Sequence, residues 1–344
     1  MSTKPKPIIK KKSSLHLPLN VLDLFCGCGG MTTGLVAAGF NVVAGIDIWD
    51  TAIETYRMNH AHSAICADLT QYTPEEFHKH HNQQIDVLVG GPPCQSFSMA
   101  GKRDRNDPRG SLFMEYVKYL DYFNPKAFIM ENVMGILSAK TAAGELVIDI
   151  ITSLLSRNYR IVVCKLYASD FEVPQNRRRV IIIGIRKDLN VTPTEPLPVG
   201  TRPPVKTVLE DRSLVPSSYY LSDMALAGIR AKKERMESKG HGFGAQFLDQ
   251  EKPSYTIPAR YWKDGYDALV RYDDIHVRRL TEIELKRIQS FPDNYKFYGN
   301  RKDTIIQIGN AVACRFAYHL GRHVAKLLYS AINSVSQYPA GALQ

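Results

Sequence analysis

The sequence predicts an α/β fold: a doubly wound, mainly parallel sheet covered by helices, with a second, smaller domain attached. Two observations lead to this prediction. Short apolar runs alternate with amphipathic stretches through the first half of the chain, and the proline-rich segment VTPTEPLPVGTRPP at 191–204 then ends that alternation. Strands that alternate with helices form parallel sheets buried on both faces. A segment so rich in proline continues neither a helix nor a central strand and therefore marks a boundary.

The elements of the first domain follow one another in pairs of a strand and a helix. The expected pairs are residues 20–25 and 31–40, 41–47 and 51–60, 85–91 and 111–123, and 126–132 and 145–156, followed by strands at 159–168 and 179–185. A further short strand is expected just before Asp68. Ligands of such sheets bind at the carboxyl ends of the strands, so functional residues are expected there.

The second half of the chain has a different character. Residues up to about 275 are polar, basic and dotted with glycine, which predicts the smaller domain. Near the end, a turn opens a long amphipathic helix that needs a core to cover its apolar face, and this helix is expected to pack back on the first domain. Its face is formed by Val312, Phe316, Leu320, Val324 and Leu327. The expected divisions are a flexible basic arm at 1–17, a first domain at 18–190, a second at 191–300 and the returning segment at 301–335.

Composition narrows the choice of partner and compartment. The chain has 344 residues, with 44 Lys and Arg against 34 Asp and Glu, and a formal net charge of +10. Such an excess favours a polyanion as partner. No apolar run approaches the roughly 18 residues of a membrane span, and no signal-peptide pattern begins the chain. The six cysteines lack paired CxxC spacing, which argues against a metal site or a disulfide framework. A cytoplasmic monomer that binds nucleic acid and no metal is expected.

A glycine-rich turn follows the first strand. In DLFCGCGG, Gly27 and Gly29 stand where the backbone must turn sharply and approach a ligand closely. Asp47 lies twenty positions beyond Gly27 at the end of the second strand, where a carboxylate binds ribose hydroxyls. The glycine spacing suits a nucleoside without a pyrophosphate. Asp68 is a candidate to accept a hydrogen bond from an adenine amino group, or alternatively caps the next helix.

A lone cysteine follows the strand at 85–91. In GGPPCQSFS, Pro92 and Pro93 stiffen an elbow that presents Cys94 at the sheet crevice. A structural cysteine is more often found within the apolar run itself, so the position favours a nucleophile. A thiolate that adds to carbon 6 of a pyrimidine makes carbon 5 nucleophilic enough to take a methyl group from a sulfonium donor.

That chemistry needs support for charge on the pyrimidine ring. Glu131, near the end of the strand at 126–132, is the candidate partner of ring nitrogen 3, although a strand-end glutamate also serves as a cap or ion-pair partner. In QNRRR, alternation places Arg177 and Arg179 on the same side, with Arg178 facing elsewhere. Arg179 is expected to donate to the pyrimidine carbonyl oxygen.

Together, these stretches resemble the DNA cytosine-5 methyltransferases of restriction-modification type. Six motifs occur in the family order and cover nearly the whole chain, which makes the resemblance very specific. They are DLFCGCGGMTTGL at 23–35, GGPPCQSFS at 90–98, ENV at 131–133, QNRRRV at 175–180, RRLTEIELKRIQSFPDNY at 278–295 and QIGNAVA at 307–313.

The resemblance implies a Rossmann-like methyltransferase domain that uses S-adenosylmethionine. It implies that Phe25 packs on the adenine, that Asp47 and Asp68 bind the ribose and the adenine amino group, and that Asn310 closes the pocket near the methionine part. Pro92 joins this cofactor set. Ile48 stands where several relatives place a tryptophan, with Trp49 just beyond, and is expected to cover the ring. The same resemblance makes Cys94 the nucleophile and Glu131 the partner of ring nitrogen 3 of the cytosine. Arg177 and Arg179 are then the polar supports of the target base.

The implied substrate is double-stranded DNA from which the cytosine is flipped, because a stacked base hides carbon 6. The basic, glycine-bounded stretch at 98–110 is expected to close over the DNA, unless it is a plain surface loop. The candidate DNA contacts are Gln95, Ser98, Arg109, Thr256, Arg260 and Lys263. Of these, Thr256 is expected on a phosphate. Arg260 and Lys263, with Tyr261 and Asp264, either read bases or serve as scaffold.

Two alternatives remain at this point. An RNA-directed relative of the same fold methylates transfer RNA, but it carries a CFT-type signature in the smaller domain that this chain lacks. A noncatalytic DNA-binding subunit would be expected to lose the nucleophile or the donor pocket, and residues of both sets are present. The recognition sequence is not encoded in any of these motifs.

Overall fold

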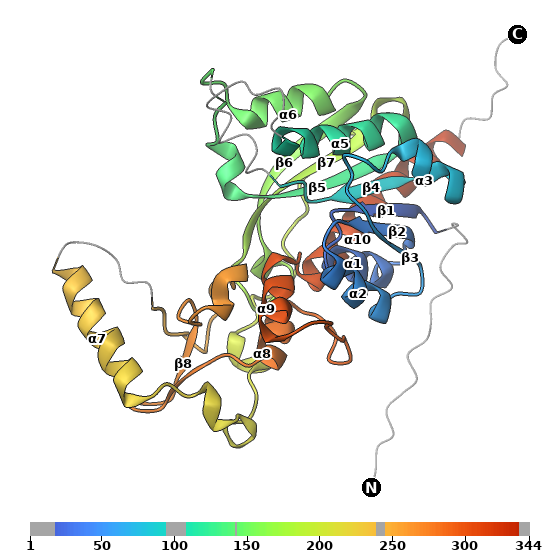
Figure 1. Ribbon diagram of the computed structural model, residues 1–344. Helices are drawn as coiled ribbons and strands as arrows, with labels where there is room; N and C mark the ends of the chain where they lie inside the picture. Colours follow the sequence, from blue (N-terminus) through green and yellow to red (C-terminus); the bar gives the residue numbers. More distant parts are fainter. Residues whose placement is uncertain (1–17, 94–107, 142, 239–244, 337–344) are drawn as a thin grey trace, which may run out of the picture.

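The computed structural model describes residues 18–93, 108–141, 143–238 and 245–336. The chain forms an α/β domain built around one large sheet, and a smaller domain lies beside the carboxyl ends of its strands (Figure 1). The helices α8 and α9 lie between the two parts, and α7 extends at the far end of the smaller domain. No helix in the described part of the chain is long and apolar enough to cross a membrane.

The large sheet has seven strands in the order β3-β2-β1-β4-β5-β7-β6. Five neighbouring strands are parallel, whereas β7 runs antiparallel to both β5 and β6. The predicted mainly parallel, doubly wound sheet is therefore confirmed. The strands are β1 (Asn20–Leu24), β2 (Asn41–Asp47), β3 (Ser63–Cys66), β4 (Val87–Gly90), β5 (Ala127–Val133), β6 (Tyr159–Tyr167) and β7 (Arg178–Arg186).

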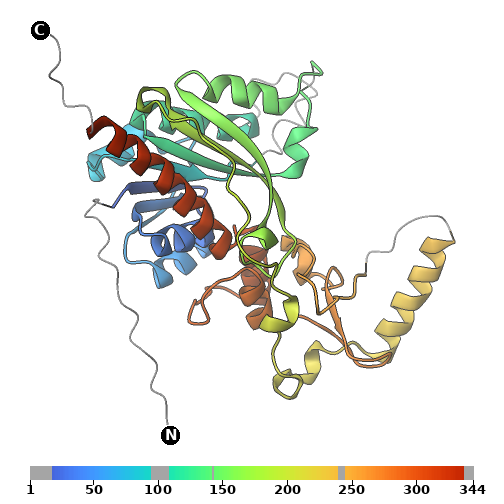
Figure 2. The same ribbon diagram turned by 180° about the vertical axis from the view of Figure 1, so that it is seen from behind.

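Helices cover both faces of this sheet. One apolar core joins the sheet to α1 and α10, and the core on the opposite face joins it to α3, α5 and α6. In the reverse view of Figure 2, the red helix α10 lies across the face of the sheet. The helices of this domain are α1 (Gly30–Ala37), α2 (Asp50–Asn59), α3 (Pro74–His80), α5 (Pro108–Phe123), α6 (Val147–Leu155) and α10 (Cys314–Ser336).

Local sequence explains where these helices form and what they bury. In α6, the buried residues Val147, Ile151 and Leu155 recur every four positions, which places them on one face. The helix α3 begins after Thr73, whose hydroxyl accepts a hydrogen bond from the Glu76 amide as an N-cap. Thr73 therefore caps this helix, and the alternative prediction that Asp68 caps it is wrong.

The helix α1 packs closely on α10 and on the residues just before it, because α1 carries glycine at two contact positions. A Cβ atom on Gly30 would lie 2.3 Å from the Val312 carbonyl oxygen, and one on Gly34 would lie 2.3 Å from that of Cys314. The prediction that the last helix returns to the first domain is confirmed, since Phe316, Leu320 and Val324 are buried in its core. Val312, just before the helix, and Leu327 are partly buried and pack against the same core, and Leu328 is buried there in addition.

The order of the strands fixes where a ligand can bind. The chain winds outward from β1 to β3 and then crosses back to β4, so the direction of winding reverses between β1 and β4. Open α/β sheets bind ligands in the crevice at such a switch point, beyond the carboxyl ends of the two strands. The glycine-rich turn follows β1 and the Pro-Pro elbow follows β4, so both predicted motifs lie at this crevice.

The smaller domain has few regular elements and its own apolar core. Its elements are the short helices η4 (Val205–Val208), η5 (Arg212–Leu214), η6 (Ser217–Tyr219) and η7 (Ala259–Trp262), the helices α7 (Asp223–Glu237), α8 (Glu282–Ile288) and α9 (Arg301–Asn310), and the strands β8 (Leu269–Arg271) and β9 (Val277–Arg279). Ile305 and Ile308 of α9 belong to this core, together with Ile257 and Tyr261. The predicted boundary at residue 301 is not decided by this packing and stays a prediction.

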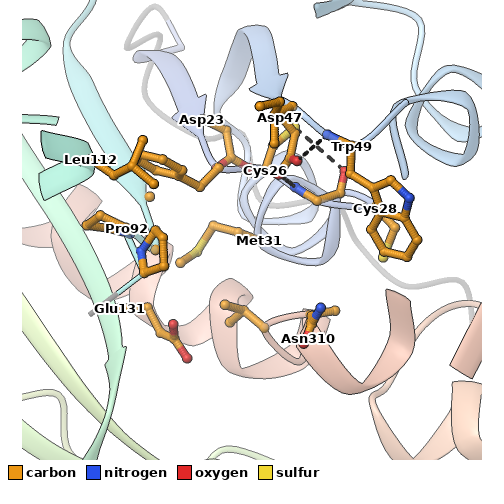
Figure 3. Close-up of a pocket in the computed structure, with 18 of the residues that line it drawn as sticks. Asp23, Cys26, Cys28, Met31, Asp47, Trp49, Pro92, Leu112, Glu131 and Asn310 are labelled. Carbon is orange, nitrogen blue, oxygen red and sulfur yellow. Dashed lines mark hydrogen bonds between the residues drawn. The ribbon is translucent and has the colours of Figure 1, made fainter. Parts of the chain in front are cut away.

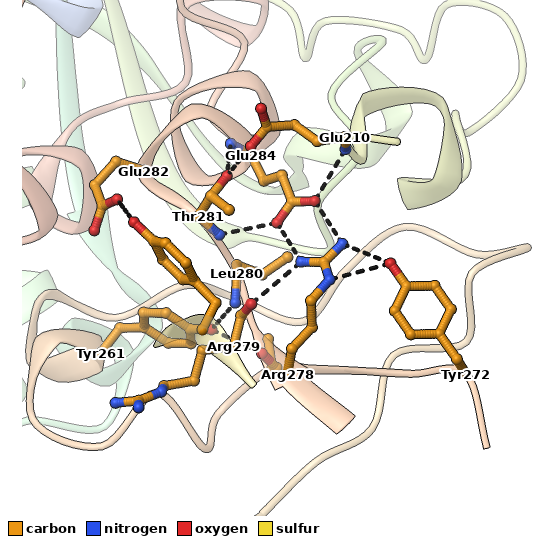
Figure 4. A network of polar contacts seen from close by, with 11 residues as sticks. Glu210, Tyr261, Tyr272, Arg278, Arg279, Leu280, Thr281, Glu282 and Glu284 are labelled. Carbon is orange, nitrogen blue, oxygen red and sulfur yellow. Dashed lines mark hydrogen bonds and ion pairs between the residues drawn. The ribbon is translucent and has the colours of Figure 1, made fainter. Parts of the chain in front are cut away.

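A buried ion pair with further polar partners lies inside the smaller domain (Figure 4). Arg278 and Glu284 are both fully buried, and the guanidinium donates to the two carboxylate oxygens at 2.7 and 2.8 Å. The Tyr272 hydroxyl accepts from Arg278 as well, at 3.0 and 3.1 Å. The amides of Thr281 and Glu210 donate to Glu284 at 2.9 and 3.0 Å. All partners are satisfied, as a buried charge requires.

Hydrogen bonds join the two domains near the start of β7. Gln175 forms a bridge to Ser254 of the smaller domain, and its side-chain oxygen accepts from the Ile257 amide at 3.1 Å. Its side-chain nitrogen donates to the Gln289 side chain at 3.1 Å, and both side chains are fully buried. This polar contact fixes the QNRRR segment against the smaller domain.

Candidate active site

One pocket opens at the switch point of the sheet. It has a volume of about 580 Å³ and is lined by the turn after β1, the ends of β2 and β4, the residues after β3, and β5. Leu112, Gln307 and residues 310–312 complete it. Figure 3 shows Asp47 and Trp49 on one side of the pocket and Glu131 and Asn310 on the other. The volume lies in the range of small-molecule sites.

The glycine-rich turn forms one wall. Phe25 has a φ of 58° and Gly27 a φ of 53°, so the chain turns through the left-handed region immediately after β1. For a non-glycine residue such as Phe25 this conformation is uncommon and is typical of functional turns. The Cys26 amide donates to the Ile46 carbonyl at 3.1 Å, which ties the turn to β2.

Asp47 holds the turn from the neighbouring strand. Its carboxylate accepts from the Gly27 amide at 2.8 Å and from the Trp49 amide at 2.9 Å. Burial raises the pKa of Asp47, although these amide hydrogen bonds oppose the effect. A carboxylate has about four acceptor positions, so two amides leave room for hydroxyl donors. Ile48 and Trp49 both line the pocket here, and the Ile48 side chain is 66% exposed.

Two further aspartates line the pocket with different environments. Asp68 follows β3, and its carboxylate accepts from the Thr70 amide and hydroxyl, both at 2.9 Å. Asp23 is buried at the end of β1 and accepts from the Thr32 hydroxyl at 2.6 Å. Burial raises the pKa of Asp23 to about 7, and the Thr32 hydrogen bond counteracts this only in part. Asp23 was not predicted as a site residue.

The Pro-Pro elbow is held by a neighbour of Glu131. The Asn132 side chain is buried and donates to the Pro92 carbonyl at 2.9 Å. Gly91 contacts Glu131 closely, since a Cβ atom at Gly91 would lie 3.2 Å from its Oε2. The elbow and Glu131 therefore adjoin. Cys94, Gln95 and Ser98 lie outside the described residues.

Glu131 and Arg179 form an ion pair across two adjacent strands. The Arg179 Nε lies 2.6 Å from the Glu131 Oε1, and each side chain is 13% exposed. The alternation predicted for QNRRR is present, because the exposed Arg178 instead stacks 5.2 Å from the centre of the Tyr167 ring. Glu131 lines the pocket, so this charged pair adjoins the space beneath the elbow.

Arg177 has different partners from Arg179. Its buried guanidinium donates to the carbonyls of Gly309 and Asn310 at 3.0 and 3.4 Å, the last two residues of α9. Burial, and then the charge of Arg179, lower the pKa of Arg177 to about 9. A cation at a helix C-terminus is stabilised by the helix dipole. Arg177 thereby fixes the helix end that carries Asn310 to the pocket.

The described cysteines other than Cys66 are poor nucleophiles. Burial raises the pKa values of Cys28 and Cys164 to about 12, and those of Cys26 and Cys314 well above their usual range. A thiolate is the reactive form, so these four thiols are inert. Among the described residues there is no group of three or more His, Cys, Asp or Glu side chains suited to a metal ion.

The candidate DNA-binding residues Thr256, Arg260 and Lys263 differ in their contacts and exposure. The Thr256 hydroxyl donates to the Asn176 carbonyl at 3.2 Å, between the two domains. Arg260 is exposed and pairs with Asp267 at 2.6 Å, and the exposed Lys263 lies 5.8 Å from the centre of the Trp262 ring.

Two of the remaining candidates have structural contacts. Tyr261 is buried, and its hydroxyl donates to Ala268 and accepts from the Leu280 amide, so for Tyr261 the scaffold alternative holds. Asp264 accepts from the Tyr266 amide in a turn. Arg109 lies in the first turn of α5, because this helix begins at Pro108 and takes up the end of the stretch predicted as a loop.

Several residues that line the pocket were not selected from the sequence, and three of them are polar or aromatic side chains beside selected ones. Asn132 directly follows Glu131, and its signal was a polar side chain at a strand end within a motif. Trp49 and Asp23 also line the pocket, and both stand beside residues that were selected. Asp23 carried the clearer signal, since a carboxylate inside an otherwise apolar strand needs a reason to be buried.

Comparison with known proteins gives a consistent result. The sequence pattern described as C-5 cytosine-specific DNA methylase matches residues 19–326. The type II methyltransferase M.FnuDI of Fusobacterium nucleatum is 33% identical over 342 residues, which cover 90% of this chain and 95% of that protein. The type II methyltransferase M.NlaX of Neisseria lactamica is 32% identical, with 92% of this chain and 98% of that protein covered.

Solved structures agree on the fold. The Dnmt2 methyltransferase of S. pombe superposes with a TM-score of 0.69 at 21% identity, covering 92% of this chain and 99% of that one. The methyltransferase EhMeth of Entamoeba histolytica gives a TM-score of 0.70 at 20% identity, with the same coverage. At these identities the likeness concerns the architecture.

Proposed function

The chain belongs to the C-5 cytosine-specific DNA methylase family, and from this premise we propose that it methylates carbon 5 of a cytosine flipped from double-stranded DNA, with Cys94 as nucleophile. The curated relatives are type II methyltransferases, which supports a role in a restriction-modification system. The observation that carries the mechanism is the placement of Glu131, paired with Arg179, beside the elbow that leads to Cys94.

The pocket fits the methyl donor used by this family. Its volume, its left-handed turn at Phe25 and the acceptor positions left on Asp47 suit a nucleoside with a ribose and no pyrophosphate. When bound, S-adenosylmethionine supplies an electrophilic methyl group on a sulfonium. Asp47 would hold the ribose, Asp68 the adenine amino group, and Phe25 and Ile48 the adenine ring. The other residues proposed to bind S-adenosylmethionine are Gly27, Gly29, Pro92 and Asn310.

The proposed chemistry uses the residues around the elbow. The Cys94 thiolate forms a bond to carbon 6 of the cytosine, and Glu131 shares the proton at nitrogen 3 as negative charge builds up on the ring. Carbon 5 then takes the methyl group, whose bond to the donor sulfur breaks so that the sulfonium leaves as a neutral thioether. Loss of the carbon 5 proton to a base, with cleavage of the bond between sulfur and carbon 6, restores the aromatic ring and frees the thiolate.

Arg179 and Arg177 have distinct parts in this proposal. Arg179 pairs with Glu131 and is proposed to orient it and to donate to the cytosine carbonyl oxygen. Arg177 supports the base site indirectly, because its guanidinium is committed to the carbonyls of Gly309 and Asn310. It therefore couples the base site to the end of α9 that lines the cofactor pocket.

DNA would lie between the two domains. The net charge of +10 supports this partner. Thr256 at the junction of the domains is proposed to contact a phosphate. Arg260 and Lys263 are proposed to approach the bases, where Arg260 makes base contacts and the Lys263 ammonium adds its charge against the adjoining phosphates. Gln95, Ser98 and Arg109 are proposed to act on the DNA from the segment after Cys94. A monomer suffices for this arrangement.

Loss of the nucleophile is the direct test. Cys94→Ala should abolish transfer of a labelled methyl group to DNA while the affinity for S-adenosylhomocysteine stays within about twofold of the wild type. Bisulfite sequencing of a plasmid from cells that express the wild type should reveal 5-methylcytosine at one short sequence. Turnover by the Cys94→Ala variant would contradict the mechanism. DNA with 5-fluorocytosine at the target should become covalently attached, because elimination requires the carbon 5 proton.

A further inference from the structure

We propose that Tyr295 is a positioning residue for the cofactor turn and thereby sets the affinity for S-adenosylmethionine, an inference that rests on the proposed function. Tyr295 lies in the segment between α8 and α9 and is buried. Its hydroxyl donates a hydrogen bond to the carbonyl of Cys28, and Cys28 lines the pocket within the glycine-rich turn. Tyr295 itself does not line the pocket, so it acts through the backbone of the turn.

The neighbours of the Tyr295 hydroxyl reinforce this contact. The His60 Nε2 lies 3.2 Å from the Tyr295 Oη and 3.4 Å from the Thr33 hydroxyl, which itself donates to the Gly29 carbonyl at 2.7 Å. Because Tyr295 gives its own proton to a carbonyl, its oxygen accepts from His60 Nε2–H. Burial lowers the pKa of His60 to about 4, so the ring is neutral near pH 7.

The turn is shaped to admit this hydroxyl. Gly29 has a φ of 90°, and a Cβ atom there would lie 2.7 Å from the His60 Nε2 and 2.9 Å from the Tyr295 Oη. The space that the glycine leaves is thus filled by the polar atoms of these two side chains. The turn and the tyrosine are therefore matched in shape. Loss of the Tyr295 hydroxyl would remove the hydrogen bond that holds the Cys28 carbonyl.

The segment that carries Tyr295 is itself anchored to α2. The Asn59 side chain donates to the Lys296 carbonyl at 2.7 Å and accepts from the Lys296 amide at 2.9 Å. The Tyr298 amide donates to the Thr55 hydroxyl at 2.8 Å. The helix α2 begins just after Asp47, so the same helix connects the carboxylate end of the pocket with the backbone of the Tyr295 segment.

The test compares Tyr295→Phe with Tyr298→Phe in the full chain. Tyr298 is a matched control, because its side chain is 53% exposed and its backbone makes the contacts described. Calorimetric titration with S-adenosylhomocysteine and steady-state kinetics would be measured for both. Loss of a buried hydrogen bond should raise the KM for S-adenosylmethionine and the Kd of the product roughly 3- to 30-fold in Tyr295→Phe. The kcat at saturation and the KM for DNA should stay at the wild-type values, as should every parameter of Tyr298→Phe.

A purely structural role predicts another pattern. If Tyr295→Phe lowers the melting temperature and the active fraction but leaves the KM and the Kd unchanged, or changes nothing, the inference is wrong. Should Tyr295→Phe fail to fold, Asn59→Ala decides, because it loosens the same segment without touching the turn and should raise the same two constants. A wild-type protein that binds no S-adenosylhomocysteine would instead overturn the proposed function, and this inference with it.

Discussion

Arg179 reaches from β7 to Glu131 on β5, where their side chains meet at 2.6 Å in an almost buried ion pair. The strands are antiparallel neighbours, so this pairing is set by the sheet itself. It orients the carboxylate at the pocket, next to Gly91 and the elbow. The proposed role of Glu131 leads to a first prediction.

Replacing Glu131 by Gln keeps the shape of the side chain and removes its acid-base function. We expect kcat to fall by about 10²- to 10⁴-fold, the usual contribution of a positioned acid-base group. The Kd for S-adenosylhomocysteine should change less than about threefold. Single-turnover transfer of a labelled methyl group and calorimetric titration would measure the two. A rate within tenfold of the wild type would exclude Glu131 from the chemical step.

Removal of one partner of the ion pair between Arg278 and Glu284 is expected to destabilise the protein strongly. Arg278→Ala should lower the free energy of unfolding by about 3–5 kcal/mol, because it leaves the Glu284 carboxylate buried without a partner. Urea unfolding followed by circular dichroism would measure it. Arg271→Ala is the matched control, since the pair between Arg271 and Asp274 is exposed and should contribute less than about 1 kcal/mol. An equal loss of unfolding free energy in both variants would contradict the claim that burial makes the ion pair between Arg278 and Glu284 matter more.

The buried Asp23 predicts a pH dependence of stability. Its pKa is about 7 in the folded protein against 3.8 in the reference state, so the folded state binds the proton more tightly. The stabilisation is complete below about pH 4 and is lost as the pH rises toward 7, a difference of about 4 kcal/mol at 1.36 kcal/mol per pH unit. Asp23→Asn should therefore unfold with a flatter dependence on pH between 4 and 7. Parallel curves for the two proteins would refute this.

The close contact between α1 and α10 predicts that a glycine replacement in α1 destabilises the protein, unlike the same replacement in α7. Gly34→Ala should lower the free energy of unfolding by about 1–3 kcal/mol, because its Cβ would lie 2.3 Å from the Cys314 carbonyl oxygen. Gly228→Ala in α7 should be neutral or stabilise by up to about 1 kcal/mol, since nothing lies within 4 Å of its Cβ position. Thermal and urea unfolding would compare them. A stable Gly34→Ala protein would mean that the helices can separate at little cost.

Arg260 and Lys263 predict different effects on DNA recognition. Asp267 orients the Arg260 guanidinium, and an oriented guanidinium suits bidentate contact with a guanine. Arg260→Ala should cost about 1–3 kcal/mol at the cognate site and relax the sequence preference. Lys263→Ala should weaken all sequences alike and reduce the salt dependence by about one charge. The affinities of both variants for cognate and scrambled duplexes, measured over a range of salt concentrations, would distinguish the two effects. An unchanged preference in Arg260→Ala would assign base reading elsewhere.

The local patterns were sufficient for the architecture and for the position of the pocket. Alternation of apolar strands with helices predicted the sheet, and parallel strands must end at one edge, so Phe25, Asp47 and Glu131 had to lie near one another. The antiparallel direction of β7 was not predicted, because an apolar run such as RVIIIGI looks the same whichever way its neighbour runs.

The sequence by itself determined the fold class, the family and the edge of the sheet where chemistry takes place, because periodicity and motifs act over a few residues. Only the tertiary structure decided which partners the polar side chains have. Arg177 bonds to Gly309, Gln175 to Gln289, and Tyr295 to Cys28, each across more than a hundred residues of chain. A side chain's spacing says which face it occupies, whereas its partner depends on which distant segment packs against that face.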